Sequence, residues 1–160
     1  MTTVRNYRHD DLDAVIEIFQ RAIREIASRD YSPAHVDSWS RVDRGEWAEW
    51  RLTRPTWVAE IDGRPVGFSD LEADGHLDMM FVHPRFQGIG VATSLLERVE
   101  REAQSLDLQQ VFVEASITAR PFFERRGFRS VGLHPIEEDG LVFTTFRMIK
   151  PMKALGVTVS

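Results

Sequence analysis

The sequence predicts an α/β (α+β) fold in which a mixed, mostly antiparallel central sheet carries helices on both faces. Helical periodicity dominates residues 11–52, and two turn signals then divide residues 57–82 into strand-like segments. Helical and strand-like patterns alternate from there to residue 149. The length of 160 residues corresponds to one domain, which can bury a core without disulfides. We therefore expect residues 1–160 to form a single domain.

One strand and two helices are predicted for the first third of the chain. Residues 2–7 are compatible with a strand, and the acidic pair Asp10–Asp11 can cap a helix over residues 11–28. Apolar positions of that helix recur at helical spacing: Leu12, Val15, Ile16, Phe19, Ile23 and Ile26. Ser32–Pro33 is typical of a helix start, so a second helix is predicted over residues 33–52.

The middle of the chain is predicted as an antiparallel meander. Strand-like segments cover residues 57–61, 66–71 and 76–82, and the turn signals Asp62–Gly63 and Asp74–Gly75 lie between them. The later elements are predicted as a helix over 88–106, a strand over 110–115, a helix over 118–126 and strands over 128–133 and 141–149. The resulting order is βααβββαβαββ. The tail over 150–160 shows no clear period and is expected to be loosely ordered.

Composition and charge exclude several classes of protein. The hydrophobic fraction of 42% is that of a globular protein, and no apolar run reaches the ~20 residues of a membrane span. The formal net charge is -5 and no basic run is present, which argues against nucleic acid as a partner. Cysteine is absent, which excludes disulfides, thiolate metal sites and a cysteine nucleophile. We expect a cytoplasmic monomer or homodimer with no metal centre and no membrane partner.

The most informative segment is residues 82–92, which leaves a predicted strand and enters a helix. Gly88 and Gly90 lie at the start of that helix, where the first N–H groups are unpaired and the helix dipole is positive. Because glycine has no Cβ, phosphate oxygens can approach this backbone closely, and Arg85 can add a charge-assisted contact. The segment is predicted to bind an anion, above all a pyrophosphate. The competing interpretation is a plain glycine-rich turn before a core helix.

Known phosphate-binding loops fit this segment unequally. The Walker A loop requires a lysine after its second glycine, and none is present. The dinucleotide fingerprint requires a third small residue where this sequence has Thr93, and an acidic residue about 20 positions further on. Asp107 lies near that distance but at a helix end, so a nucleotide-dependent oxidoreductase stays an alternative. After these two comparisons, the segment is best described by the pattern Arg-x-x-Gly-x-Gly over residues 85–90.

Two segments resemble motifs of the GNAT superfamily of N-acyltransferases. Residues 85–92 resemble its motif A and read Arg-Phe-Gln-Gly-Ile-Gly-Val-Ala. Residues 119–128 resemble its motif B, usually Ala-x-x-x-Tyr-Glu-Lys-x-Gly-Phe, and read Ala-Arg-Pro-Phe-Phe-Glu-Arg-Arg-Gly-Phe. The predicted element order is similar to that fold over residues 2–149. Two further segments, over 30–33 and 116–119, resemble the YafP-like group of bacterial GNAT proteins.

This resemblance implies acetyl-CoA as the co-substrate. Its pyrophosphate is expected at the backbone amides of residues 86–91, and its pantetheine arm along the strand edge of residues 80–82, where the family splays its two central strands. Residues 111–115 are expected on the other side of that gap. Ser116 stands where many members have asparagine and can still hydrogen-bond the pantetheine. The cofactor-binding residues implied are Met80, Phe81, Val82, Arg85, Phe86, Gln87, Gly88, Ile89, Gly90, Val91, Ser116 and Phe123.

The implied reaction needs a base. A lysine-like amine has a free pKa near ~10.4, so it arrives protonated and must lose a proton before it attacks the thioester. Asp78 is the first candidate, because it lies two residues before Met80 on the same face of the strand. His76 and His83 are the alternatives, and each candidate can act through water. The N–H of Met80 or its neighbour can polarise the thioester oxygen.

The general acid is the point at which the sequence departs from the family. Phe123 occupies the position of the usual tyrosine and cannot protonate sulfur. A thiol of pKa ~8.5 leaves as the thiolate at about pH 7.5 against only ~1.4 kcal/mol, so turnover does not require an acid. Tyr31, reaching in from the predicted helical hairpin, is the alternative proton donor.

These features predict an acetyl-CoA-dependent N-acyltransferase that acetylates a primary amine of a small molecule. Direct attack in a ternary complex is expected, because no cysteine is present for a covalent relay. The alternative, motivated by Phe123, is a non-catalytic acyl-CoA binding or sensing module. Candidates for the acceptor site are Tyr31, His35, Trp39, Trp47 and Trp50. Packing of the helical hairpin is the competing role of the tryptophans, whereas aromatic rings beside acidic residues suit a small cation.

Overall fold

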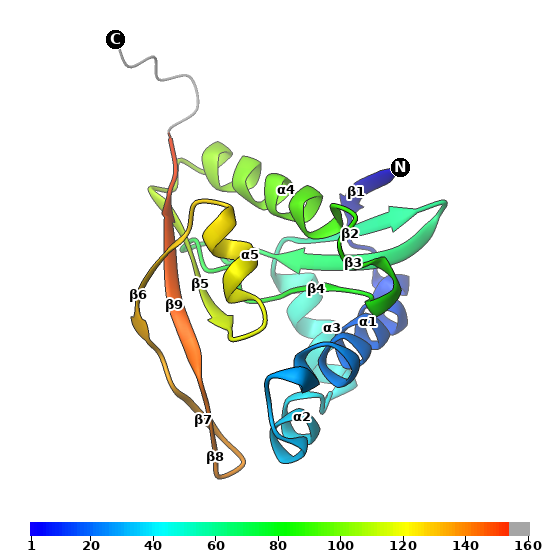
Figure 1. The fold of residues 1–160 in the computed structure, drawn as a ribbon. Helices are drawn as coiled ribbons and strands as arrows, with labels where there is room; N and C mark the ends of the chain where they lie inside the picture. Colours follow the sequence, from blue (N-terminus) through cyan, green and yellow to red (C-terminus); the bar gives the residue numbers. More distant parts are fainter. Residues whose placement is uncertain (154–160) are drawn as a thin grey trace.

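Two antiparallel sheets form the body of the protein, which the computed structural model describes over residues 1–153 (Figure 1). The first sheet runs in the order β1 (Thr2–Asn6), β2 (Thr56–Ile61), β3 (Arg64–Asp70) and β4 (Met80–Val82). The second runs in the order β5 (Gln110–Ser116), β9 (Thr145–Pro151) and β6 (Arg129–Leu133). A separate hairpin of β7 (Ile136–Glu138) and β8 (Leu141–Phe143) continues the second sheet at one end.

Helices cover both faces of the first sheet, which confirms the predicted fold class. One side carries α1 (Leu12–Glu25), α2 (Pro33–Trp39) and α3 (Arg44–Thr53), and the other carries α4 (Val91–Ser105). The short helix α5 (Arg120–Arg125) contacts β5 and β6. Buried core residues include Val15, Ile23, Trp47 and Phe68 on the α1 side, and Leu95, Val99 and Val113 on the α4 side. Within residues 1–153, no helix has both the length and the apolar character that crossing a membrane requires.

The single helix predicted over residues 33–52 is wrong, because two helices replace it. Trp39 ends α2, and Arg44 begins α3. Between them, the Oδ1 atom of Asp43 accepts the N–H of Glu46 at 3.0 Å and so caps a new helix. Apolar residues keep a helical spacing across this break, which is why periodicity alone hides it.

The third predicted strand is also shorter than expected, since β4 comprises only the last three of residues 76–82. Asp70, at the end of β3, provides the reason. Its Oδ1 atom accepts the N–H groups of Asp78 at 3.0 Å and Met79 at 2.8 Å. A side-chain carboxylate thus replaces the backbone ladder over the first part of this segment.

The predicted turn at Asp74–Gly75 is present: the N–H of Glu72 donates to the carbonyl oxygen of His76 across it at 2.8 Å. The turn also reaches the second sheet. The N–H of Phe112 donates to the carbonyl oxygen of Gly75 at 3.0 Å, and the N–H of Leu77 donates to that of Phe112 at 2.9 Å. A Cβ on Gly75, whose φ is 97°, would lie 2.5 Å from the carbonyl oxygen of Gln110. This close approach between the sheets therefore requires glycine.

Beyond this turn the two sheets part, so that β4 and β5 diverge (Figure 1). In the part of the chain that the structure describes, β4 pairs with β3 and β5 pairs with β9, while no ladder joins β4 to β5. The structure therefore contains the splayed strands that the resemblance implies.

The C-terminal strands differ from the prediction. The polar loop expected between the last two strands folds into the β7–β8 hairpin around Asp139–Gly140, whose φ values are 53° and 74°. The strand predicted over residues 141–149 is divided into β8 and β9, and β9 extends to Pro151. Lys150 and Pro151 are strand residues, which corrects the expectation of a loose tail at these positions. The remainder of that expectation, over 154–160, lies outside the described residues.

A fully buried ion pair fixes the end of β3. The side chains of Arg51, on α3, and Asp70 have no exposed surface, and Nη2 of Arg51 donates to Oδ2 of Asp70 at 3.0 Å. Burial raises the pKa of Asp70, whereas the Arg51 charge and the N–H of Met79 oppose that shift. Because the same carboxylate binds the backbone before β4, the pair connects α3 to the point where the sheets divide.

Breaking this pair should destabilise the fold strongly. Asp70→Ala leaves the Arg51 cation buried without a partner, so we expect a loss of about 3–5 kcal/mol in the free energy of unfolding. The matched control is Asp13→Ala, which removes an exposed ion pair with Arg44 and should change that free energy by less than about 1 kcal/mol. Urea denaturation followed by circular dichroism measures both variants, and equal losses would contradict the prediction.

Candidate active site

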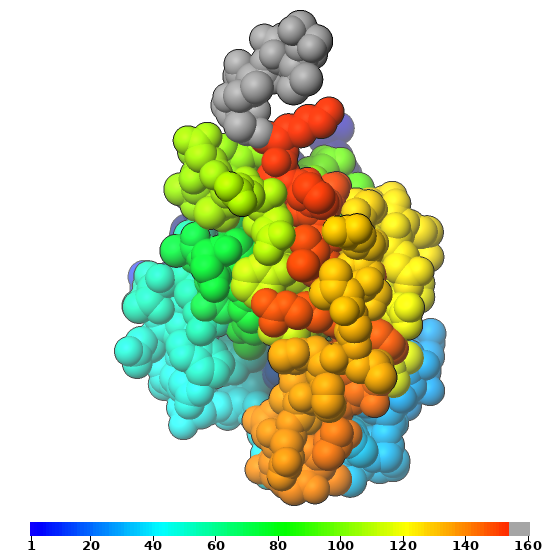
Figure 2. Space-filling model, turned by 90° about the vertical axis from the view of Figure 1, so that its left-hand side faces the viewer, coloured from blue at the N-terminus to red at the C-terminus, as the bar shows by residue number. Residues whose placement is uncertain are grey.

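A large cavity lies where the two sheets diverge and α1–α3 approach them. Its volume is about 1210 Å³, and residues of both sheets, the helical layer and the glycine loop line it. Figure 2 shows this face hollowed between the cyan residues, which include α3, and the orange β7–β8 hairpin. Predicted site residues that line the cavity are Tyr31, Asp78, Met80, Phe81, Val82, Phe86, Gln87, Gly88, Gly90, Val91, Ser116 and Phe123. Arg85 and Ile89 are exposed and do not line it.

The glycine loop enters α4 without a side-chain cap. Gly88 has a φ of 73° and Gly90 a φ of 92°, and the first helical residue is Val91. A Cβ built on either glycine would meet no heavy atom within 4 Å, so the backbone here faces open space. The N–H groups of the first helical turn are therefore available to an anion.

Two contacts hold this loop at the end of β4. Nε2 of Gln87 donates to the carbonyl oxygen of Val82 at 2.8 Å, and the N–H of Arg85 donates to Nδ1 of His83 at 3.1 Å. His83 is buried and does not line the cavity, and burial together with the nearby Arg21 charge lowers its pKa. The structure thus places His83 under the loop and away from the cavity surface where a base is needed.

The free edge of β4 faces the gap between the sheets. Two backbone hydrogen bonds flank β4 on its β3 side. The N–H of His83 donates to the carbonyl oxygen of Val66, and the N–H of Asp70 donates to the carbonyl oxygen of Met79. Backbone groups of successive strand residues point to opposite sides, so those of Met80 face away from β3 and toward β5. An acyl oxygen held in the gap can accept the Met80 N–H.

Positive charge gathers at the same end of the cavity as the glycine loop. Arg125 and Arg126, at the end of α5, both line the cavity, although neither was among the predicted site residues. Nη2 of Arg126 donates to Oγ1 of Thr93 in the first turn of α4 at 2.6 Å. The signal was present in the sequence, since both arginines directly precede the glycine of the second motif.

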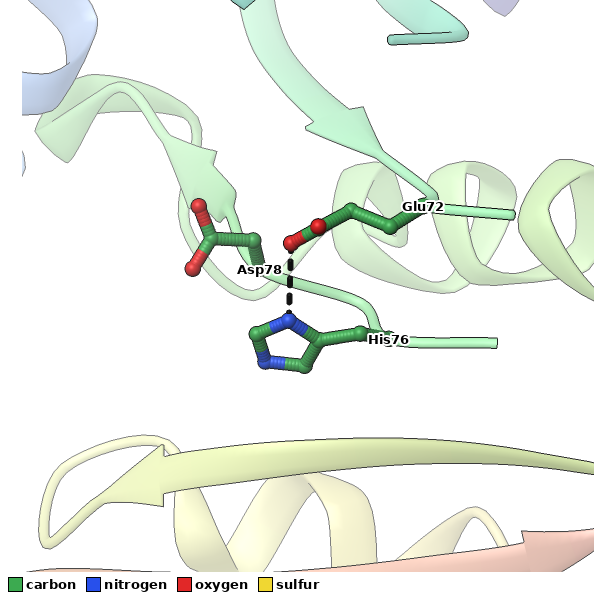
Figure 3. A group of neighbouring side chains, drawn as sticks. All are labelled: Glu72, His76 and Asp78. Carbon is green, nitrogen blue, oxygen red and sulfur yellow. Dashed lines mark hydrogen bonds and ion pairs between the residues drawn. The ribbon is translucent and has the colours of Figure 1, made fainter. Parts of the chain in front are cut away.

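A cluster of titratable side chains lies where the sheets separate (Figure 3). Nδ1 of His76 lies 2.8 Å from Glu72, and its Nε2 lies 3.0 Å from Glu114 of the second sheet. The ring stacks on Phe112 with centroids 4.9 Å apart. Burial lowers the pKa of His76, but Glu114 and Glu72 outweigh burial, and the net shift is upward. His76 is thus suited to carrying a positive charge between two carboxylates.

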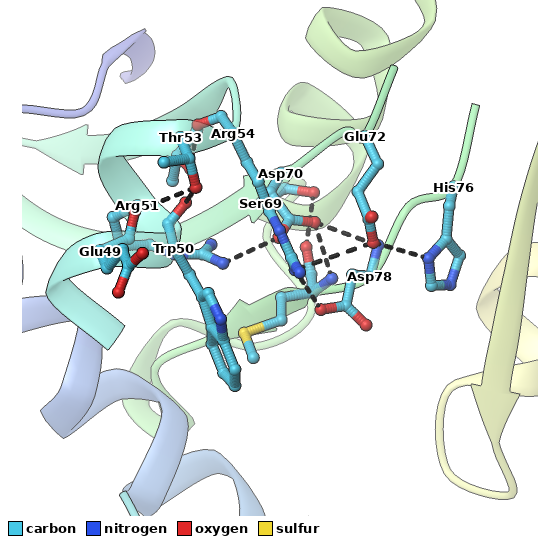
Figure 4. A network of polar contacts seen from close by, with 12 residues as sticks. Glu49, Trp50, Arg51, Thr53, Arg54, Ser69, Asp70, Glu72, His76 and Asp78 are labelled. Atoms are coloured by element: carbon cyan, nitrogen blue, oxygen red, sulfur yellow. Dashed lines mark hydrogen bonds and ion pairs between the residues drawn. The ribbon is translucent and has the colours of Figure 1, made fainter. Parts of the chain in front are cut away.

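Asp78 belongs to the same cluster and faces the cavity (Figure 4). Its Oδ2 atom pairs with Nη1 of Arg54 at 2.8 Å, its backbone N–H donates to Asp70, and its side chain is 34% exposed. Ligand atoms of Glu72, His76 and Asp78 lie within 4.8 Å of one another, a spacing that a metal ion could bridge. Arg54 and His76 already supply positive charge there, so the cluster does not require a metal.

Tyr31 connects the helical layer to the second sheet. Its hydroxyl donates to the carbonyl oxygen of Thr144 at 2.8 Å and accepts the N–H of Ile117 at 2.9 Å. Burial raises the pKa of Tyr31, so the phenol stays protonated at neutral pH. The hydroxyl lies at the cavity wall, but its proton is engaged by a backbone carbonyl.

Further polar contacts hold the β7–β8 hairpin against α2. Oγ of Ser38 donates to Asp139 at 2.6 Å, and Nη1 of Arg41 pairs with the same carboxylate at 3.2 Å. Nε2 of His35 lies 2.9 Å from the carbonyl oxygen of Val142. These contacts, with the Tyr31 hydroxyl, form one wall of the cavity. His35 supports that wall but does not line the cavity.

Phe123 of the second motif and Ser116 at the end of β5 both lie at the cavity surface. Phe123 is buried against Phe122 and Phe128, with ring centroids 5.3 and 5.1 Å away, and brings no hydroxyl into the cavity. Oγ of Ser116 accepts the N–H of Ala119 at 3.1 Å, which leaves its own proton free for a ligand.

Three tryptophans among the acceptor-site candidates line the cavity: Trp39, Trp47 and Trp50. Trp47 also packs in the core, edge-on to Phe19 at 4.7 Å. Trp50 lies under the guanidinium of Arg54 at 5.4 Å. Packing and lining are therefore compatible roles for these rings.

Known proteins similar to this chain share one family. The sequence profile described as "Acetyltransferase (GNAT) domain" matches residues 27–150. The uncharacterized N-acetyltransferase YafP of Escherichia coli is 39% identical over 145 residues, which cover 91% of this chain and 93% of that protein. The peptidyl-lysine N-acetyltransferase YjaB of Salmonella typhimurium is 27% identical over 156 residues, which cover 94% and 99% of the two chains.

Solved structures show the same fold. A GCN5-related N-acetyltransferase from Rhodopseudomonas palustris superposes with a TM-score of 0.92 at 28% identity, covering 95% of this chain and 96% of that chain. The protein yncA of Salmonella typhimurium, solved with acetyl-CoA, superposes with a TM-score of 0.73 at 18% identity, and the match covers 100% of this chain and 99% of that chain.

The carboxylate clamp on His76 predicts a pH-dependent contribution to stability. Because the pKa is raised in the folded protein, this contribution is complete below the ordinary value of 6.5 and is lost as the pH rises through the folded pKa. The free energy of unfolding of the parent protein should therefore exceed that of His76→Gln most at about pH 6, and the difference should shrink at alkaline pH. Glu114→Gln should move the NMR titration of His76 to lower pH. A difference between parent and His76→Gln that grows with pH would contradict the prediction.

Proposed function

This chain belongs to the GNAT acetyltransferase family and is an acetyl-CoA-dependent N-acetyltransferase, and we propose that it transfers the acetyl group directly to a primary amine in a ternary complex. The observation that carries the proposal is the gap between β4 and β5, which opens into one cavity with the glycine loop at one end and Asp78 on its wall. Donor and acceptor can therefore meet without a covalent enzyme intermediate.

The donor is proposed to lie along the gap. Its pyrophosphate would take the N–H groups at Gly88, Gly90 and the first turn of α4, where Arg125 and Arg126 add positive charge. Its pantetheine arm would run beside the open edge of β4, which brings the thioester oxygen to the Met80 N–H.

The acceptor is proposed to attack from the α3 side. A carboxylate first takes one proton from the ammonium group and releases it to water. The nitrogen lone pair then forms a bond to the thioester carbon, the carbon–sulfur bond breaks, and the second nitrogen proton passes to the same carboxylate. Asp78 fits this role because it lines the cavity close to Met80 and has one carboxylate oxygen outside the Arg54 pair. His76 also lines the cavity, but its two ring nitrogens face Glu72 and Glu114, which favours the protonated form.

The departing sulfur is proposed to leave as a thiolate. Phe123 offers no proton, and the Tyr31 hydroxyl donates to Thr144 in this structure. A thiolate of pKa ~8.5 leaves against about 1.4 kcal/mol near pH 7.5, so this route needs no acid. Tyr31 is the candidate donor only in a state in which its bond to Thr144 opens.

Side chains at the two loop glycines should weaken cofactor binding. In Gly88→Ala and Gly90→Ala, a Cβ at positive φ strains the loop and occupies the open space over the N–H groups, so we expect at least about a tenfold loss of affinity for CoA. Gly63→Ala is the matched control, because Gly63 has a φ of 77° and an equally open surrounding in the β2–β3 turn. Calorimetry with CoA compares the three variants. Unchanged affinity in both loop variants would remove the proposed pyrophosphate site.

Loss of the Asp78 carboxylate should slow the reaction without weakening the donor complex. We expect Asp78→Asn to lower kcat by about 10²–10⁴, while the affinity for acetyl-CoA is unchanged. Release of free thiol from acetyl-CoA over a panel of primary amines measures the rate. Glu72→Gln is the control, since Glu72 belongs to the same cluster but does not line the cavity. Strong CoA binding without turnover in the parent protein would favour the acyl-CoA binding module instead.

Removing the Tyr31 hydroxyl should affect stability more than chemistry. Tyr31→Phe loses two hydrogen bonds, so we expect the free energy of unfolding to fall by about 1–3 kcal/mol, with less than about a tenfold change in kcat. Thermal denaturation and steady-state kinetics measure the two effects. A loss of about 10² or more in kcat at unchanged KM would establish Tyr31 as the general acid.

A further inference from the structure

Charge is distributed unequally along the cavity, and this distribution bears on the acceptor. The glycine-loop end carries Arg125 and Arg126, and no acidic residue lines it beside the first turn of α4 within residues 1–153. The opposite end is lined by acidic residues from four different segments: Asp43, Glu46, Asp78, Glu114 and Glu138. Arg41 also lines the cavity there, but its guanidinium already pairs with Asp37 and Asp139. Since the polyanionic cofactor is attracted to the cationic end, the acidic end is left to the acceptor.

We propose that the acceptor is an aliphatic amine that carries a second positive charge, as in a long diamine or a polyamine; this inference rests on the proposed function. The first ammonium group would lose its proton at Asp78. The second would stay charged and be bound by the acidic rim at the start of α3. The methylene chain between them would lie on the tryptophan rings.

The position of α3 supports this arrangement. Glu46 lies at its start and Arg54 directly follows its last residue, so about 12 Å of helical rise separates them. Arg54 pairs with Asp78 at 2.8 Å, which places the proposed base near the far end of the helix (Figure 4). Glu46 and Asp78 both line the cavity and are therefore two separate anionic points on its wall, one at the start of α3 and one beside the residue that follows its end.

The wall between these points is aromatic. Trp47 and Trp50 line the cavity between Glu46 and Arg54 in the sequence of α3. Indole faces bind methylene chains and cations, whereas they offer few partners to a neutral polar substrate. An amine with a methylene chain and a positive charge at each end can contact both carboxylates and the tryptophan rings between them.

The carboxylates differ in how far they are already paired. Asp78 pairs with Arg54 and Glu114 with His76, so their charges are partly compensated inside the protein. Within residues 1–153, no ion pair involves Glu46, and its side chain lies at the exposed rim of the cavity. Glu46 is thus free to bind a second ammonium group, which makes it the specificity-determining residue of this inference.

A matched pair of substrates tests the inference. 1,7-Diaminoheptane and 1-aminoheptane have the same chain and differ in the second charge. Thiol release from acetyl-CoA should show a kcat/KM about tenfold or more higher for the diamine at low salt, and the preference should shrink at high ionic strength. Glu46→Gln should lower this preference severalfold. Glu49→Gln should leave it unchanged, because Glu49 lies on the same helix, is exposed and does not line the cavity.

Other outcomes separate this inference from the proposed function. Equal kcat/KM for the two amines, or a higher value for a blocked lysine peptide than for the diamine, would overturn the inference while acetyl transfer stands. If acetyl-CoA binds but no amine is acetylated, the proposed function fails. Calorimetry of both amines with the CoA complex then decides the inference: tighter binding of the diamine supports it, and equal or absent binding overturns it.

Discussion

The buried Asp70 carboxylate is the interaction on which the arrangement of the site depends. It lies at the end of β3, pairs with the buried Arg51, and accepts the N–H groups of Asp78 and Met79. A buried charge is tolerated only when its partners compensate the loss of water, and here they come from two separate segments, α3 and the residues just before β4. The same contacts that stabilise the charge therefore fix where β4 begins and which way its edge faces.

The division of the sheets follows from this constraint. The turn around Gly75 joins the sheets at Phe112, and β4 then runs beside β3 without reaching β5. The resulting gap exposes the backbone of Met80, places Asp78 on the cavity wall, and opens toward the uncapped start of α4. Backbone geometry thus supplies the proposed donor side of the site, whereas side chains of α3 and the β7–β8 hairpin supply the proposed acceptor side.

Local pattern was sufficient to identify most of the elements and the position of the glycine loop, but not the features that depend on distant partners. Apolar spacing identified α1 and α4, and the absence of Cβ atoms at Gly88 and Gly90 identified the loop. The break before α3 was missed because the Asp43 cap is a single polar residue inside a continuing helical period. The shortening of β4 was missed because it depends on Asp70, eight residues earlier in the chain.

Some site residues were also missed because their position depends on residues that are distant in the sequence. Arg125 and Arg126 were overlooked because only the fold brings the end of α5 to the start of α4. Arg85 and Ile89 belong to the loop by sequence, yet both are exposed outside the cavity. Consecutive residues of an irregular loop point in different directions, and no period predicts which of them face a ligand.

The β7–β8 hairpin is attached to α2 by a few polar contacts and by the buried ring of Phe143, which packs edge-on to His35 at 4.8 Å, and its other residues contribute little to either apolar core. The cofactor end, by contrast, is built from β4, α4 and their buried residues. Substitutions at the exposed hairpin residues, in contrast to Phe143, are therefore expected to leave the fold and the proposed donor site intact. Such a division allows lineages of one ancestral enzyme to diverge in the amines they modify while keeping a common source of acetyl groups.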